Sequence, residues 1–196
     1  ERLHAQLTQI FPTMPLSGAY IQIDDLGKSK DEIEPHPHYH DSVVHAQGVH
    51  DINDVTWILL KTRAVVAFGD DPSFEYAPDW THIKMAMLDN LNIYWRQFLR
   101  NPPRIAWLYS DYGVEWVVLG MLRLFYTLER DDITSKSGAG DYGLAHLSKR
   151  WHPIIHEALN LRHGQKTLYR SRLWRAISAY RFAGYIIRLC NGKYAE

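Results

Sequence analysis

Ser135 and Lys136 have the residue types and the position to bind a phosphate. They lie within the segment "DDITSKSGAGDYG" (131–143), just ahead of a run of small residues. A serine often precedes the first turn of a helix, where free backbone N–H groups and the helix dipole attract anions. A lysine in that turn adds a point charge suited to phosphate. An ordinary capped helix start would use the same two residues, so both interpretations stay open from these residues alone.

Three glycines in the same segment have the spacing of a dinucleotide-binding loop. Gly138, Gly140 and Gly143 form the pattern G-x-G-x-x-G. In dinucleotide-binding folds this loop follows a β-strand, which aims the loop and the next helix at the pyrophosphate. Here the preceding stretch, 113–129, has apolar residues at helical spacing. The sequence therefore does not favour a dinucleotide site, and we interpret the glycines as incidental to phosphate binding.

A histidine-rich segment, "PHPHYHDSVVHAQGVH" (35–50), could bind a metal ion. His36, His38 and His40 alternate along it, and alternate residues of an extended chain point to the same side. Imidazole is a common metal ligand. Since neither a cysteine nor a cluster of carboxylates accompanies them, we favour a solvated loop and predict no metal site, with chelation as the alternative.

Composition limits the class of protein. Of the 196 residues, 46% are hydrophobic and 13% aromatic, which is typical of a folded globular chain. Cys190 is the single cysteine, so an intramolecular disulfide framework is excluded and a reducing, cytoplasmic location is expected. No apolar run approaches the roughly 18 residues that cross a bilayer. We expect a monomer that binds neither membrane nor nucleic acid.

The charges are unevenly distributed, although they sum to zero. Residues 1–122 hold 9 basic and 16 acidic residues, and residues 123–196 hold 13 basic and 6 acidic residues. The asymmetry fits two halves that attract each other. It equally fits an enzyme that holds a cationic substrate on one wall and a polyanion on the other.

Hydrophobic periodicity predicts a mainly α protein with a small α/β segment first. Residues 18–24 and 64–69 are predicted strands on either side of a helix at 51–63. Gly164 and Gly192 are predicted to follow the last two of five later helices. Those five form an antiparallel bundle over 78–191, with helices at 78–99, 113–129, 136–148, 152–162 and 168–191.

The segment "WVVLGMLRLFYTLERDDITSKSGAGDYGLAHL" (116–147) is more specific than its parts. Its parts follow one another in a set order: an apolar helix that carries an arginine, then an aromatic–Thr–Leu turn, then Ile-x-Ser-Lys, and last a small-residue helix that ends in Leu. This order resembles the C-terminal helical domain of the streptomycin/spectinomycin (aminoglycoside (3'')(9)) adenylyltransferases and their nucleotidyltransferase relatives. The resemblance extends over about 51–165. In that family ATP and the antibiotic lie between this domain and an N-terminal nucleotidyltransferase domain.

The resemblance implies roles for three basic residues and for four residues that precede them in the sequence. Arg123, Lys136 and Arg162 match positions that bind the ATP phosphates; without the resemblance, Arg123 would be interpreted as part of a salt bridge inside the bundle. The family's acidic wall, which suits a polycationic acceptor, corresponds to "LYSDYGVEW" (108–116). The acceptor-binding candidates there are Asp111, Tyr112, Glu115 and Trp116, although Trp116 stands where the family has a small polar residue.

The same resemblance implies ATP and Mg²⁺ as cofactors, the metal held by a Gly-Ser turn followed by Asp-x-Asp. These 196 residues contain no such motif. Asp24, at the end of the predicted strand 18–24, is the one candidate for the catalytic base. We expect 1–72 to be the end of a nucleotidyltransferase α/β domain and 73–196 to be a helical domain that holds nucleotide and substrate. We also expect the chain to be part of a longer enzyme with further nucleotidyltransferase residues upstream.

The leading hypothesis is therefore part of an enzyme that moves AMP from Mg-ATP to a hydroxyl of an aminoglycoside-like cationic acceptor, with antibiotic resistance as the implied role. One alternative is a non-catalytic helical module that binds nucleotide or RNA, since Arg150 and His156 have the Arg-x5-His spacing of some RNA-cleaving toxins. Another is a structural partner that pairs through its aromatic residues.

Overall fold

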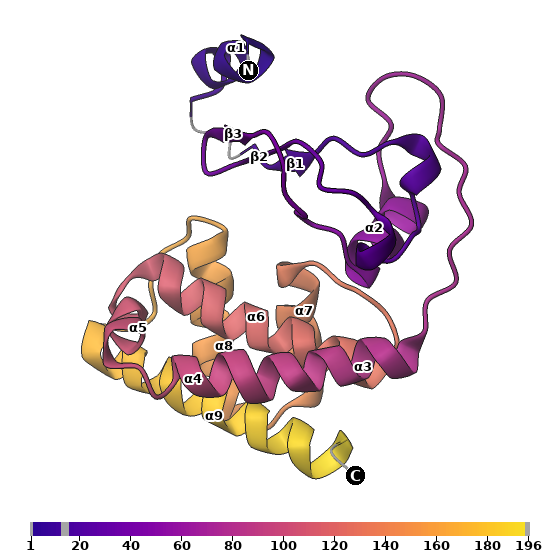
Figure 1. The fold of residues 1–196 in the computed structure, drawn as a ribbon. Coiled ribbons are helices and arrows are strands. Elements are labelled where there is room, and N and C mark those ends of the chain that lie inside the picture. The colour runs from indigo at the N-terminus through magenta and orange to yellow at the C-terminus, as the bar shows by residue number, and fades with distance from the viewer. Residues whose placement is uncertain (1, 13–15, 195–196) are drawn as a thin grey trace. The chain divides into compact units, whose positions relative to one another are not determined.

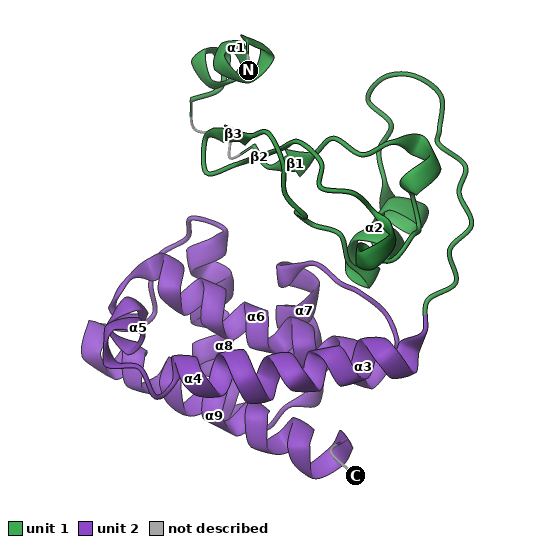
Figure 2. Cartoon of the chain, in the orientation of Figure 1, with its two compact units in different colours: residues 1–78 green, residues 79–196 purple. Residues whose placement is uncertain are grey.

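The computed structural model describes residues 2–12 and 16–194 (Figure 1). It divides into two compact units, Glu1–Pro78 and Asp79–Glu196 (Figure 2). The chain is mainly helical with a small α/β segment first, as predicted, and its strands form one antiparallel sheet. The assignment of 1–72 to the end of a nucleotidyltransferase domain stays a prediction.

The first unit is built around a three-stranded antiparallel sheet in the order β1-β2-β3. Tyr39 lies opposite Gly18 on one side and Val44 on the other. Asp41 and Ser42 form the turn of the hairpin and both have positive φ, which a tight hairpin turn requires. The elements of this unit are α1 (Arg2–Ile10), β1 (Gly18–Ala19), η1 (Ile23–Asp25), η2 (Lys30–Glu32), β2 (His38–His40), β3 (Val43–His45) and α2 (Asp54–Arg63).

Two predicted strands were wrong. Of 18–24, only Gly18–Ala19 is a strand, and Asp24 lies exposed on the 3-10 turn η1 instead of on a strand. Residues 64–69 form no strand, and Phe68 is 98% exposed. Both segments have β-prone composition, but a strand also needs a neighbouring strand to pair its backbone groups. That partner is not visible in the local pattern.

A small cluster of Ile33, Ile52 and Trp57 forms the core of the first unit. The indole Nε1 of Trp57 donates to the carbonyl of Lys28 at 2.8 Å. Asn53 caps α2 by accepting from the backbone N–H of Thr56, so this unit has its own ordered interior and its helix begins at a proper cap.

The second unit is all helix. Its first run, predicted as 78–99, is continuous from Trp80 to Phe98 and includes a π-helical stretch. A short helix that begins at the two prolines was not predicted. The elements are α3 (Trp80–Asp89), η3 (Asn90–Trp95), α4 (Arg96–Phe98), α5 (Pro102–Ala106), η4 (Trp107–Tyr109), α6 (Asp111–Arg130), α7 (Lys136–His146), η5 (Lys149–Trp151), α8 (His152–Arg162) and α9 (Arg172–Tyr194).

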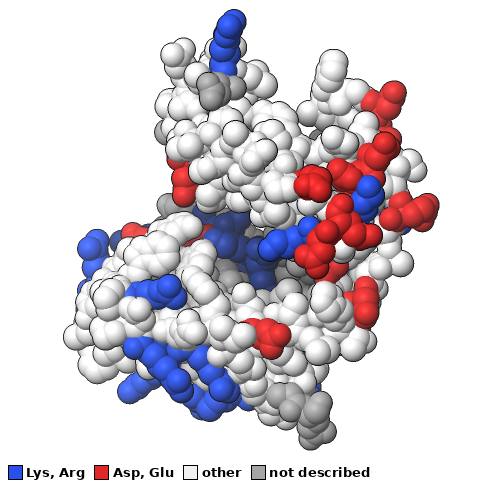
Figure 3. All heavy atoms as spheres, viewed as in Figure 1, with Lys and Arg blue, Asp and Glu red and all other residues white. Residues whose placement is uncertain are grey.

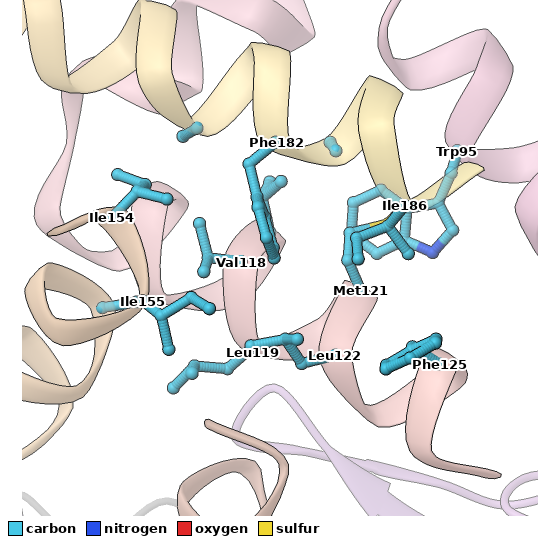
Figure 4. Close-up of a cluster of buried hydrophobic side chains, with 14 of the residues drawn as sticks. Trp95, Val118, Leu119, Met121, Leu122, Phe125, Ile154, Ile155, Phe182 and Ile186 are labelled. Carbon is cyan, nitrogen blue, oxygen red and sulfur yellow. The ribbon is translucent and has the colours of Figure 1, made fainter. Parts of the chain in front are cut away.

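Helix α6 passes through the middle of this unit and supplies much of its core (Figure 1). Val118, Leu119 and Leu122 are fully buried. They face Ile155 on α8 and Phe182 on α9 (Figure 4). Burying each such side chain stabilises the fold by about 1.5–3 kcal/mol, so α6 is the rigid element on which a site can be built.

The glycines of α7 allow close helix packing. A Cβ on Gly140 would lie 2.6 Å from Leu159 Cδ2 on α8, and a Cβ on Gly143 would lie 2.7 Å from Leu122 Cδ2 on α6. Both distances are far below van der Waals contact. The glycine spacing therefore serves the approach of α7 to its two neighbours and does not form a phosphate loop.

Gly164 follows α8 with a positive φ of 65°, as predicted, but the prediction for Gly192 was wrong. Helix α9 continues through Gly192 to Tyr194. The carboxylate of Glu129 on α6 explains this, because it accepts hydrogen bonds from Lys193 Nζ at 2.6 Å and from the Tyr194 hydroxyl. These contacts hold the last turn in place.

Glu129→Gln is expected to destabilise the helical unit by about 1.5 kcal/mol at pH 7, since it weakens two hydrogen bonds to a charged acceptor. Burial acts to raise the pKa of Glu129, but the bonds from Lys193 and Tyr194 outweigh it and lower that pKa. The stabilisation is therefore present above the unfolded-state pKa of about 4.3 and is lost as pH falls through the lower folded value. Urea denaturation at pH 7 and pH 3 measures this, and equal effects at both would contradict it.

Among the helices formed by residues 2–12 and 16–194, none is both long and apolar enough to cross a membrane.

Candidate functional site

One face of α6 carries three of the candidate residues. Glu115 follows Tyr112 by three positions and Arg123 follows Glu115 by eight, and both separations are close to whole helical turns. The helix begins at Ser110, whose Oγ accepts from the backbone N–H of Gly113 at 2.9 Å. This cap and the buried opposite face of α6 fix the direction in which the three side chains point.

Lys136 opens α7, as its sequence context predicted. Ser135 is the capping residue, and its Oγ accepts from the N–H of Gly138 at 3.0 Å. The chain leaves α6 through Asp131 in a left-handed conformation, and the connection to residue 135 then returns along the helix. As a result, Lys136 Nζ lies 3.1 Å from Glu115 Oε1 near the start of α6.

Arg162, the last residue of α8, reaches the same carboxylate. Its Nη1 donates to Glu115 Oε1 at 3.0 Å. The Glu115 side chain is only 15% exposed, so its charge requires partners. Lys136 and Arg162 thus converge from two helices on one oxygen, and the trio carries a surplus of one positive charge.

Arg123 adds a further positive charge to this cluster. Burial, together with the like charge of Arg162, lowers the pKa of Arg123. Within the part of the chain that the structure describes, no acidic group pairs with its guanidinium, so the salt-bridge interpretation finds no support there. Lys136 and Arg162 share the single carboxylate of Glu115, so together with Arg123 the described residues leave two positive charges uncompensated. We call these three residues and Glu115, four in all, the cation cluster.

Tyr112 and Trp116 differ in what they can contact. Tyr112 is exposed and lies beneath Lys136, whose Nζ is 5.8 Å from the ring centroid. Trp116 instead packs among aromatic rings, with centroid distances of 4.7 Å to Trp95 and 5.5 Å to Trp107. Tyr112 is therefore available to a ligand at the cation cluster, whereas Trp116 chiefly fills the space between helices.

Asp111 has a structural partner. Its Oδ1 accepts from Arg175 Nη2 at 2.6 Å, although the Asp111 side chain is 63% exposed. Arg175 also donates to Glu157 Oε1 at 3.2 Å and to the carbonyl of Tyr109 at 3.2 Å. Of the two predicted carboxylates, Glu115 lies in the cation cluster and Asp111 lies in a separate ion-pair network.

A comparison with known protein families finds a similarity in this region. Residues 106–186 match the family model described as the aminoglycoside adenylyltransferase, C-terminal domain. This region of the chain is similar to the C-terminal domain of the aminoglycoside adenylyltransferases. The match contains the whole cation cluster and the other acceptor-binding candidates. No curated protein matches the chain.

Sequence reasoning missed the buried ion pair between Glu157 and Arg175 in the helical unit. Glu157 is fully buried and Arg175 is 3% exposed. Besides Arg175, Glu157 accepts from the Thr167 hydroxyl and the Leu168 N–H, both at 2.6 Å. The sequence did contain a signal for this ion pair, namely a single acid inside the mostly apolar stretch "IIHEALNL" (154–161). A charge on a buried helix face needs a partner, so the acid predicts one.

The other chemical candidates have different surroundings. Arg150 lies over the rings of Trp151 and Tyr185, and His156 lies edge-on to His152, so the two residues of the Arg-x5-His pattern have separate partners. In the first unit, the ring of His38 stacks between those of His45 and His50 at 4.7 and 4.9 Å. No three His, Cys, Asp or Glu side chains among the described residues are arranged to hold a metal ion.

Proposed function

We propose that this chain holds nucleotide and acceptor for an adenylyltransferase that moves AMP from Mg-ATP to a hydroxyl of an aminoglycoside-like molecule. The observation that carries the proposal is the cation cluster, in which Lys136 and Arg162 converge on Glu115 beside an Arg123 that pairs with no acid among the described residues. Its place within an aminoglycoside adenylyltransferase domain supports the same reaction.

The cations would bind the triphosphate of ATP. Guanidinium groups match phosphate oxygens with two parallel hydrogen bonds, and lysine adds a point charge. A triphosphate would also compensate the two positive charges that Glu115 leaves uncompensated. The Arg123 guanidinium can bind a phosphate without breaking an ion pair, because no acid among the described residues pairs with it.

The residues of the cation cluster do not fit a magnesium site. Mg²⁺ requires several oxygen ligands, and Glu115 is the single carboxylate of a cluster with three cations. We therefore assign the metal to no residue of this cluster and derive no step through it. The contribution of these side chains is to bind and orient the phosphates and to supply one carboxylate.

Glu115 would couple the two ligands. When phosphate oxygens take over Lys136 and Arg162, the Glu115 carboxylate loses both partners and becomes available to an ammonium group of the acceptor. The exposed ring of Tyr112 beside it offers a face for a sugar or a cation. Nucleotide and acceptor would then each raise the affinity of the domain for the other.

Glu115→Gln tests this proposal by titration calorimetry with MgATP and with streptomycin as the acceptor probe. We expect streptomycin affinity to fall about tenfold, because an ion pair to a partly buried carboxylate is lost. MgATP affinity is expected to stay the same or to rise, since a competing anion has been removed from the cations.

Asp141→Asn is the matched control, because Asp141 is an exposed acid on α7 outside the cation cluster. It should bind both ligands like the wild-type chain. The proposal fails if the wild-type chain binds neither ligand, or if Glu115→Gln leaves streptomycin affinity unchanged.

A further inference from the structure

A second group of basic residues surrounds a hollow elsewhere on the helical unit. The hollow has a volume of about 650 Å³. Its walls come from the end of α4, from η5 and from the middle of α9, and its lining includes five arginines, namely Arg96, Arg100, Arg150, Arg181 and Arg188. In Figure 3, Lys and Arg gather on the helical unit over the region of α4 and α9. None of these five residues belongs to the cation cluster.

Helical spacing brings the arginines together. Arg96 and Arg100 are one turn apart, so they extend from the same face. Arg181 and Arg188 are two turns apart on α9, with Gly184 between them. Gly184 also lines the hollow, and because it has no side chain the Arg188 guanidinium lies close over it, with Nη1 3.4 Å from where a Cβ would be.

The charge of this hollow is not compensated by the protein. Neither Asp nor Glu is among the residues that line it. Within residues 2–12 and 16–194, no ion pair joins any of the five guanidinium groups to an acid. Five like charges around one hollow repel one another, and a bound polyanion would remove that repulsion.

The remaining walls favour a defined ligand over loosely held counter-ions. Leu99, Trp151 and Ile187 supply apolar surface. The Arg150 guanidinium is fixed 4.7 Å from the Trp151 ring centroid and 5.2 Å from that of Tyr185. Cation–π contacts of this kind position a guanidinium while its N–H groups stay free to donate.

We propose that this hollow binds a small molecule that carries a chain of phosphate groups. Arginine forks match phosphate oxygens, and an oligophosphate has the several charges that five arginines require. The volume lies within the roughly 300–1,000 Å³ typical of small-molecule sites. An apolar hollow shares Tyr180 and Arg181 with it, so the ligand can also carry a flat apolar group such as a nucleobase.

The test is calorimetry with inorganic triphosphate on the chain that carries Arg123→Ala and Lys136→Ala. This background removes the proposed ATP site, so the remaining binding reports on the arginine-lined hollow alone. We expect it to retain triphosphate binding, and Arg181→Gln with Arg188→Gln to reduce that affinity at least tenfold. Arg172→Gln is the matched control, because Arg172 is an exposed arginine of the same helix outside the hollow.

Titrations with ATP and with a 12-nucleotide single-stranded RNA distinguish the source of the phosphates. ATP bound more tightly than triphosphate supports a nucleotide with its base in the apolar hollow, and equal affinity supports a bare oligophosphate. Two results would overturn the proposal: an equal loss of triphosphate affinity in Arg172→Gln, or RNA that displaces triphosphate at lower concentration than ATP does. Circular dichroism of each variant confirms that the helices are intact.

Discussion

Arg123→Ala and Lys136→Ala are each expected to weaken MgATP binding at the cation cluster at least tenfold while the helical unit stays folded. A hydrogen bond to a charged group contributes roughly 1.5–3 kcal/mol, and about 1.4 kcal/mol corresponds to a factor of ten in affinity. Titration of a fluorescent ATP analogue against each variant, with unlabelled MgATP as competitor, measures the loss.

The prediction also concerns the unfolding free energy of the Arg123→Ala variant. Arg123 pairs with no acid within residues 2–12 and 16–194, and burial together with the like charge of Arg162 lowers the pKa of Arg123. Removing the Arg123 charge should therefore leave the unfolding free energy unchanged or raise it. An arginine kept for an internal salt bridge would show the opposite, with lower stability and unaltered ATP affinity.

Arg172→Ala is the control for general loss of positive charge, since Arg172 is exposed on α9 and lies apart from both basic sites. Unchanged ATP affinity in both Arg123→Ala and Lys136→Ala would remove the phosphate-binding role from the cation cluster. The similarity of residues 106–186 to the aminoglycoside adenylyltransferase C-terminal domain would stand, because it does not depend on that role.

Helices were predictable from the sequence where local signals agree. For α7, the cap at Ser135 and the small residues after it specify a start that the structure confirms at Lys136. The strands were not predictable from local signals, because a strand depends on a pairing partner elsewhere in the chain. The segment at 64–69 is as β-prone as many true strands, yet it pairs with nothing among the described residues and stays exposed.

The candidate site shows the same division between local and distant information. That Lys136 lies at a helix start was readable from its neighbours, but its contact with Glu115 depends on the path of residues 131–135 back along α6. Likewise, Asp111 and Glu115 lie one helical turn apart, and the sequence alone assigned both the same role in binding the acceptor. Arg175, 64 positions after Asp111, pairs with Asp111, whereas Lys136 and Arg162 pair with Glu115.

Arg175→Met is expected to have the largest effect on stability, with a loss of about 3–5 kcal/mol in the free energy of unfolding. The change leaves the Glu157 carboxylate fully buried without its positive partner, and an uncompensated buried charge costs about that much. Thr167 and Leu168 still donate to Glu157, but neutral donors do not replace a charge. Urea denaturation followed by circular dichroism measures the loss.

A double-mutant cycle separates the pair from its surroundings. Glu157→Gln keeps the shape of the side chain and removes its charge, so Glu157→Gln combined with Arg175→Met should be more stable than Arg175→Met alone. If the double variant is instead less stable by the sum of the two single effects, the charges do not interact and the network assignment is wrong. The result bears on function, because Glu157 holds the start of the segment from Thr167 to α9 while Arg175 holds Asp111 at the start of α6. Loss of this pair should therefore weaken ligand binding at Glu115 and Arg162 indirectly, without any change to a residue of the cation cluster.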